Sequence, residues 1–216
     1  MTGSGRNQGE KMKEVLWHGR GGQGAFTAAR LLGAAASSAE GTFALAFPSF
    51  GPERRGAPMR AFTKMDRAPI GDRSAVRKAD YVVYLDETLL GHLWTEELKP
   101  TGLVLVNSAK DFEDARILSI DANGISADIL GRPIPNTVFL GAIAALDDCV
   151  TLETAIGAIR GYMPAKLHER NERIVNVAYR AVSELAATRF HAPGAESMAP
   201  GDSSIAGASR ETSMER

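Results

Sequence analysis

This chain of 216 residues contains a single cysteine, Cys149. A single thiol can form neither an internal disulfide nor a four-cysteine iron–sulfur or zinc site. Cys149 also has no base near it in the sequence, so we interpret it as a buried structural thiol and not as a nucleophile. A self-contained iron–sulfur centre on this chain is therefore excluded.

Long apolar segments and an excess of charge are lacking as well. No apolar run reaches the roughly 18 residues needed to cross a bilayer, and residues 1–13 lack the apolar core of a signal peptide. The formal net charge of −1 argues against nucleic-acid binding, because nucleic-acid-binding domains are usually strongly basic. Hydrophobic residues still make up 44% of the chain. We therefore expect a soluble, cytoplasmic protein with one substantial core and no membrane insertion.

Both ends of the chain have compositions that bury little apolar surface. Residues 1–11 are rich in Gly, Ser, Asn and Gln, and the C-terminal segment mixes Pro, Gly, Ser and Ala with scattered charges. Such segments do not form a packed core. We predict a disordered leader over residues 1–11, a folded domain over 12–188 and a flexible tail over 189–216.

Strand and helix patterns alternate between these ends. Short apolar runs predict six strands, at residues 14–17, 42–47, 58–64, 81–85, 103–106 and 117–120. Longer segments of helical composition or periodicity predict helices at residues 25–38, 122–130, 137–146, 151–160 and 166–188. This alternation predicts a single-domain, Rossmann-like α/β fold: a mostly parallel sheet flanked by helices and covered on both faces.

A glycine cluster follows the first predicted strand. Residues 19–24 read Gly-Arg-Gly-Gly-Gln-Gly, the pattern of a phosphate-binding loop whose free N–H groups point at an anion. A dinucleotide site would also need an acid just after the second strand, but that strand leads into residues 48–51, Pro-Ser-Phe-Gly, and Glu40 precedes it. We therefore do not expect NAD or flavin binding. The alternative to a ligand is close packing of strand, turn and helix, which suits Gly24 best.

A second loop, residues 47–58, carries Arg54 and Arg55 together with Phe47 and Phe50. Loops that follow the carboxyl ends of parallel strands meet at one crevice, so we expect this loop to lie beside the glycine cluster. The arginines could pair with phosphate or carboxylate groups, or form solvated ion pairs. The phenylalanines favour burial against another surface.

A third segment, residues 131–137, reads Gly-Arg-Pro-Ile-Pro-Asn-Thr. Its prolines predict an extended path, and Asn136 or Thr137 is expected to cap a helix that begins at Val138. Asn136 and Arg132 would also be close enough to contact an anion at that helix N-terminus, although capping is our preferred interpretation.

Four other polar residues have simpler interpretations. His18 and His92 have no partners at metal-ligand spacing, so both are interpreted as structural. The adjacent acids at residues 147–148 precede a predicted helix and would complement its dipole.

Taken together, the three segments closely resemble the gamma subunit of the 2-oxoacid:ferredoxin oxidoreductases, a family whose best-known member acts on pyruvate. The resemblance covers roughly residues 12–185 in the same order, and includes Lys166, Leu167, Glu169 and Asn171. It implies a subunit of an enzyme that decarboxylates a 2-oxoacid to an acyl-CoA and passes electrons to ferredoxin. The leader and the tail depart from the family's usual compact form.

The resemblance also implies a division of labour among subunits. The reaction needs thiamine diphosphate, with Mg²⁺, and iron–sulfur clusters. These groups are expected on alpha, beta and delta partner subunits, because this chain lacks both the necessary cysteines and a thiamine-binding Gly-Asp-Gly motif. We therefore expect no catalytic residue, no metal and no cofactor held by this chain alone, and an inactive isolated chain.

What remains for this subunit is assembly, coenzyme A binding and closure of the active site. The positions predicted to contact coenzyme A are Gly19, Arg20, Gly21, Gly22, Gln23, Gly24, Arg54, Arg55 and Asn136. The alternative is a purely structural interaction subunit, either of the same complex or of an aromatic 2-oxoacid (phenylglyoxylate, indolepyruvate) dehydrogenase in which a flavin subunit passes electrons to NAD. The sequence does not determine which 2-oxoacid is used.

Overall fold

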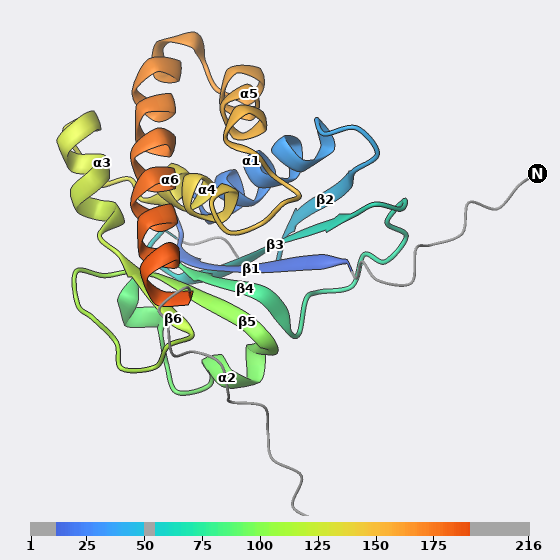
Figure 1. Ribbon diagram of the computed structural model, residues 1–216, viewed down its shortest axis with the longest axis horizontal. Coiled ribbons are helices and arrows are strands. Elements are labelled where there is room, and N and C mark those ends of the chain that lie inside the picture. The colour runs from blue at the N-terminus through green and yellow to red at the C-terminus, as the bar shows by residue number, and fades with distance from the viewer. Residues whose placement is uncertain (1–11, 50–54, 191–216) are drawn as a thin grey trace, which may run out of the picture.

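A computed structural model describes residues 12–49 and 55–190 (Figure 1). The predicted leader, Arg54, Phe50 and most of the predicted tail lie outside these residues. The elements in chain order are β1 (Lys13–Arg20), α1 (Ala25–Ser37), β2 (Phe43–Pro48), β3 (Pro58–Asp66), β4 (Ala79–Tyr84), η1 (Glu87–Leu89), α2 (Trp94–Glu97), β5 (Leu98–Asn107), β6 (Ile117–Ile120), α3 (Ala122–Leu130), α4 (Asn136–Ala144), α5 (Leu152–Tyr162), η2 (Ala165–Leu167) and α6 (His168–Phe190).

All six predicted strands and all five predicted helices are present. The largest difference is in β5, which begins at Leu98 and not at Leu103. The short elements η1, α2 and η2 were not predicted, because three or four residues are too few to show a hydrophobic period. Helix α6 extends to Phe190, just past the predicted end of the domain.

The strands form one sheet in the order β2-β3-β1-β4-β5-β6. The pairs β1–β4, β4–β5 and β5–β6 are parallel, whereas β3 runs antiparallel to both β1 and β2. The predicted α/β fold with a mostly parallel sheet is therefore confirmed, with β3 as the one reversed strand in it. β3 can be reversed because a hairpin loop, and not a crossover helix, connects it to β2.

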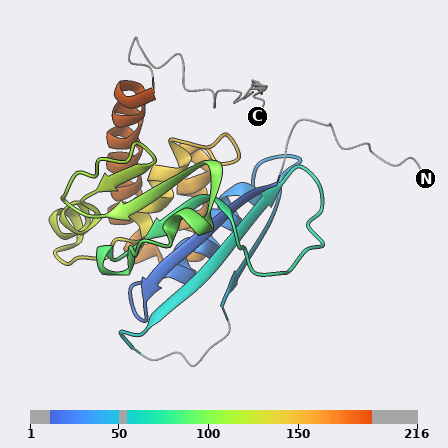
Figure 2. The same cartoon turned by 90° about the horizontal axis from the view of Figure 1, so that it is seen from below.

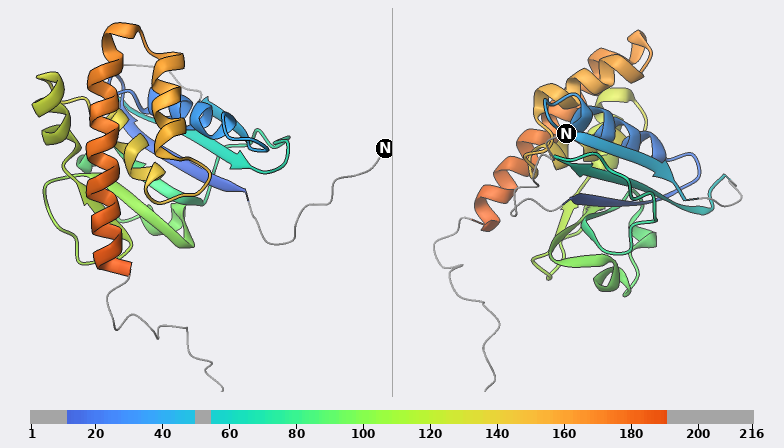
Figure 3. Two further views of the ribbon diagram at one scale, coloured as in Figure 1. Left: turned by 45° about the horizontal axis from the view of Figure 1, so that its top comes forward. Right: turned by 90° about the vertical axis from the view of Figure 1, so that its right-hand side faces the viewer.

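The two faces of the sheet are covered unequally. Helices α1, α3, α4, α5 and α6 all lie on one face (Figures 1 and 3), while within the described residues the other face carries the short helices α2 and η1 and loops (Figure 2). Successive residues of β1 serve opposite faces: Trp17 belongs to the core under the long helices, and Leu16 to the core under α2. Both faces are thus buried, although the long helices are segregated to one side.

Helix α4 lies at the centre of the helical layer, and every one of its residues is buried. Gly141 of α4 lies directly against the backbone carbonyl of Val175 in α6, so the two helices approach too closely there for any larger residue. No helix in the described part of the chain is both long enough and apolar enough to cross a membrane.

Candidate functional site

The glycine loop connects the carboxyl end of β1 to the start of α1. Gly22 and Gly24 have φ angles of +100° and +82°, a backbone region that residues with side chains rarely adopt. A Cβ on Gly22 would meet no atom of the described residues within 4 Å, whereas one on Gly24 would contact the side chain of Asn136. Gly22 is therefore the part of the loop that is open to a ligand, and Gly24 is a packing position, as predicted.

Two hydrogen bonds join this loop to the base of the β2–β3 hairpin. The Gly21 amide donates to the carbonyl of Ala57 at 2.9 Å, and the Gly56 amide donates to the carbonyl of Gly21 at 3.0 Å. The predicted adjacency of the two loops is thus confirmed. Arg55 lies next to this junction, is exposed, and has no hydrogen-bond or ion-pair partner among the described residues. Its guanidinium is therefore available.

Phe47, at the other end of the same hairpin loop, packs within the chain. Its ring centroid lies 5.2 Å from that of Phe62 on the neighbouring strand, on the face that carries α2. The chain's own sheet thus leaves this ring half-buried, and its burial against a second surface stays a prediction.

Arg20 and Gln23 brace the loop through hydrogen bonds within the chain. The Arg20 guanidinium donates from Nε to Asp86 Oδ2 at 2.9 Å and from Nη2 to Thr88 Oγ1 at 2.8 Å. Gln23 accepts from the Arg20 amide at 2.7 Å and donates to Asp86 at 3.3 Å. Both residues were predicted to contact coenzyme A, yet their side chains are engaged within the chain.

Asp86, which follows β4, belongs to this site although no sequence motif indicates it. Burial alone would raise the pKa of this carboxyl, but hydrogen bonds from Thr88, Arg20 and Gln23 outweigh burial and hold the pKa below its ordinary value. The only signal in the sequence was its position just after a buried strand, where side chains gather at the carboxyl edge of a parallel sheet.

The backbone amides of the loop divide into two groups. Those of Gly21 and Gln23 donate to carbonyls of Ala57 and Arg20. Those of Gly22 and Gly24 have no partner among the described residues, and no side chain caps the first turn of α1. The open side of the site therefore consists of these amides and the N-terminus of α1, an arrangement that suits an anion. Gly19 lies within β1, where a Cβ would lie 3.1 Å from that of Ala25, so it serves packing.

Helix α4 begins at Asn136, one residue before the predicted range 137–146 and two residues before Val138. Its N-cap is Pro135 and its first residue is Asn136, with no side-chain cap, so the prediction that Asn136 or Thr137 caps a helix starting at Val138 is wrong. The physical reason is that proline already holds a helical φ, here −75°, and starts the helix itself. The buried Asn136 side chain lies against Gly24, and its Oδ1 accepts from the Thr137 amide at 2.9 Å.

His18 has a structural role on the other face of the sheet. Its Nε2 lies 2.8 Å from Glu97 Oε2, and its ring stacks on Tyr84 at a centroid distance of 4.5 Å. Burial would raise the pKa of Glu97, but hydrogen bonds from His18 and Tyr84 outweigh burial and hold that pKa below its ordinary value. These contacts anchor α2 under the sheet.

Cys149 lies in the turn between α4 and α5. Burial, together with the negative charge of Asp147, raises the pKa of its thiol to about 12. Asp147 is itself almost fully buried: its Oδ1 accepts from the Cys149 amide at 3.0 Å, and its Oδ2 lies 3.6 Å from Lys13 Nζ. Asp147 therefore holds this turn, and the thiol has the properties of a structural residue.

Comparison with known proteins identifies the family. Residues 14–181 match the family described as pyruvate ferredoxin/flavodoxin oxidoreductase. The chain belongs to this family. Pyruvate synthase subunit PorC of Methanothermobacter thermautotrophicus is 44% identical over 177 residues, which are 81% of this chain and 98% of that protein. The pyruvate/ketoisovalerate oxidoreductases common subunit gamma of Pyrococcus furiosus is 43% identical over 178 residues, 78% of this chain and 96% of its own.

A solved structure of the family has the same fold. The pyruvate oxidoreductase subunit PORC of Thermotoga maritima superposes with a TM-score of 0.68 at 38% identity, covering 79% of this chain and 97% of that one. The resemblance to gamma subunits that the three sequence segments indicated is therefore confirmed.

Proposed function

We propose that this chain is the gamma subunit of a CoA-linked 2-oxoacid:ferredoxin oxidoreductase and forms part of its coenzyme A site. The thiamine diphosphate and the iron–sulfur clusters belong to alpha, beta and delta subunits in this proposal, since one cysteine cannot ligate a cluster. The observation that carries this proposal is the pair of hydrogen bonds between Gly21 and residues 56–57. They join the glycine loop, residues 19–24, to the arginine loop, residues 47–58.

The residues present fit a phosphate-bearing ligand. The Gly22 and Gly24 amides at the N-terminus of α1 would supply donors, and a ligand could approach the Gly22 backbone because no described side chain lies within 4 Å of where its Cβ would be. Arg55, with its exposed guanidinium, would supply the charge. Arg20 is not a charge partner in this proposal, because it is paired with Asp86. The role of this chain is then to bind and orient coenzyme A, while partner subunits carry out the redox chemistry.

The test is charge reversal in the assembled complex. Arg55→Glu, and separately Arg54→Glu, should raise the KM for coenzyme A by about tenfold or more, the loss expected for one charged hydrogen bond, and leave the KM for the 2-oxoacid unchanged. Arg180→Glu, on the exposed face of α6, is the matched control and should leave both KM values unchanged. An unchanged KM for coenzyme A in an intact complex would refute the assignment.

A second candidate, a purely structural interaction subunit, is favoured by one observation. Arg20, Gln23 and the Gly21 amide are satisfied within the chain, so the loop is braced without any ligand. Under this alternative, Arg55→Glu reduces the amount of the other subunits that co-purify and leaves the turnover of the complex that does assemble unchanged.

The 2-oxoacid and the final electron acceptor are settled by a separate measurement. The complex purified through this chain from its native host should be assayed with pyruvate, branched-chain and aromatic 2-oxoacids, and with ferredoxin or NAD as acceptor. We propose ferredoxin as the acceptor; reduction of NAD by a complex that contains a flavin subunit would favour the aromatic 2-oxoacid alternative.

A further inference from the structure

The two edges of the sheet are protected to different degrees. At one edge, β6 is only four residues long, and the carbonyl of Ile117 accepts a hydrogen bond from Arg189 Nη1 at 2.9 Å. At the other edge, β2 has the uncharged sequence Phe-Ala-Leu-Ala-Phe-Pro, and no described segment pairs with its outer side. An apolar edge strand without a charge is a template for pairing with another strand.

The backbone of β2 directs a defined set of groups outward. The Ser49 amide donates to the Arg60 carbonyl at 2.8 Å, which sets the phase of the antiparallel ladder. Because hydrogen-bonded and non-hydrogen-bonded pairs alternate, Phe43, Leu45 and Phe47 bond to β3. The N–H and C=O groups of Ala44 and Ala46 therefore point away from the sheet, toward any added strand.

The surface beside these groups is open. A Cβ on Gly33 of α1 would lie 3.3 Å from that of Ala46, so the alanine side chains face α1. A shallow groove of about 410 Å³ runs along this side, lined mostly by small residues: Arg30, Gly33, Ala34, Ser37, Ser38, Ala44, Ala46 and Tyr162. On the opposite face, the Phe43 side chain is 43% exposed. Among these lining residues Arg30 is the one long side chain of α1, and its guanidinium lies 5.6 Å from the Tyr162 ring centroid. The other lining residues of α1 are small, which leaves room for a second strand beside Ala44 and Ala46.

We propose that β2 pairs with β2 of a second copy of this chain, antiparallel, about a two-fold axis at Leu45. Residues 43–47, Phe-Ala-Leu-Ala-Phe, read the same in both directions. With Leu45 opposite Leu45 of the second copy, each outward-pointing Ala44 lies opposite an outward-pointing Ala46. The two strands then exchange all four hydrogen bonds that these residues offer, and the two sheets become one.

The order of side chains along β2 favours a second copy of β2 as its partner over an unrelated strand. Backbone hydrogen bonds alone would accept any extended segment. In the two-fold register, however, each exposed Phe43 meets Phe47 of the other copy, and aromatic pairs across a ladder stabilise it. The strand carries no charge, so self-pairing brings no like charges together. Because the same patch serves both copies, the assembly closes as a dimer.

Disulfide cross-linking of the full-length chain tests the register. In a Cys149→Ala background, Leu45→Cys should form a covalent dimer under mild oxidation, because the two cysteines would be directly opposite. Phe43→Cys alone should not, since its counterpart would lie four residues along the ladder, about 13 Å away. An equal mixture of Phe43→Cys and Phe47→Cys should cross-link again. Equal cross-linking of Leu45→Cys and Phe43→Cys, each alone, would overturn the proposal.

A proline variant tests the hydrogen bonds. Ala46→Pro removes an N–H that points outward, so the pairing with β3 is kept, but two intermolecular bonds are lost. Its dimer dissociation constant in sedimentation equilibrium should rise by about tenfold or more, while Ala46→Ser, which keeps the N–H, stays close to the wild type. A wild-type chain that is monomeric at all concentrations, or a Leu45→Cys chain that cross-links to a different subunit in the assembled complex, would contradict the proposed pairing.

Discussion

The side-chain amide nitrogen of Asn136 lies 2.5 Å from the position that a Cβ on Gly24 would occupy. This contact joins the N-termini of α1 and α4, two helices whose starts are more than a hundred residues apart in the chain. Since Asn136 is buried, its side chain has little freedom to move aside.

Gly24→Ala should destabilise the domain for two reasons. The positive φ costs about 1 to 2 kcal/mol for a residue with a side chain, and the new methyl group must displace Asn136, which adds about 1 to 3 kcal/mol. Urea denaturation measures the sum. Gly22→Ala is the matched control, because its φ is also positive but the space beside it is open. Equal losses for the two variants would show that Asn136 imposes no constraint.

The stability conferred by Asp86 should depend on pH. Because the pKa of Asp86 is lowered in the folded state from its ordinary 3.8, its contribution is complete above that value and is lost as the pH falls through the folded-state pKa. Asp86→Asn should therefore cost about 1 to 3 kcal/mol at neutral pH, and the difference from the wild type should shrink as the pH falls below the ordinary pKa of 3.8. Denaturation curves at several pH values test this, and a difference that stays constant over the range would contradict it.

A buried pair links α4 to α6. The hydroxyl of Thr137 donates to Asn171 Oδ1 at 2.9 Å, and both residues are buried. Thr137→Val keeps the shape but leaves the Asn171 oxygen without its donor, which should cost about 1 to 3 kcal/mol of unfolding free energy. Thr137→Ser keeps the donor and should lose only about 1 kcal/mol, the contribution of one methyl group. If the serine variant is the less stable of the two, packing and not the hydrogen bond is what Thr137 provides.

Cys149 should react slowly with alkylating reagents in the folded chain. With its pKa raised from 9.0 to about 12, the thiolate fraction at neutral pH falls roughly a thousandfold. Mass spectrometry of iodoacetamide-treated protein should show slow modification without urea and fast modification in urea. Asp147→Asn removes the neighbouring negative charge and should speed the folded-state reaction. A folded-state rate equal to that in urea would show that the thiol is not protected.

Local patterns in the sequence predict the strands and helices, and they also predict that the glycine loop and the arginine loop lie at the same end of the sheet. Each of these predictions depends on only a few neighbouring residues: the apolar run that ends at Trp17, the glycines at 19–24, and the arginine loop. Once β1 and β2 run in the same direction, their carboxyl ends share an edge, and the Gly21–Ala57 hydrogen bond follows from that placement.

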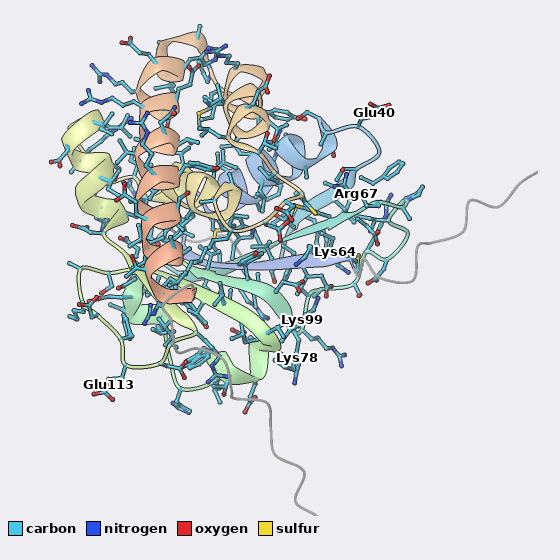
Figure 4. All side chains as sticks on the ribbon, in the orientation of Figure 1. Glu40, Lys64, Arg67, Lys78, Lys99 and Glu113 are labelled. Carbon is cyan, nitrogen blue, oxygen red and sulfur yellow. The ribbon has the colours of Figure 1, made fainter. Side chains whose placement is uncertain are left out.

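The contacts that stiffen the site could not be predicted in the same way. Arg20 and Asp86 are 66 residues apart, and His18 and Glu97 are 79 residues apart. No short motif encodes such a pair, because its geometry depends on how β1, β4 and α2 pack. A similar limit applies along the amino edge of the sheet, where charged side chains from separate segments converge (Figure 4). There Lys64 Nζ lies 2.6 Å from Asp72, and Lys99 Nζ lies 2.7 Å from Asp80.

The position of the reversed strand β3 explains why no acid is needed after β2. In a dinucleotide-binding fold, the second strand lies next to the first, and an acid at its end reaches the ribose. Here β3 lies between them, so the end of β2 is two strand spacings, about 9.5 Å, from the end of β1. A carboxylate placed there would be too far from a sugar held at the glycine loop. In the coenzyme A site proposed above, this end of the sheet would therefore offer N–H donors to phosphate groups and no acid to the ribose, so recognition of the nucleoside would fall to residues elsewhere.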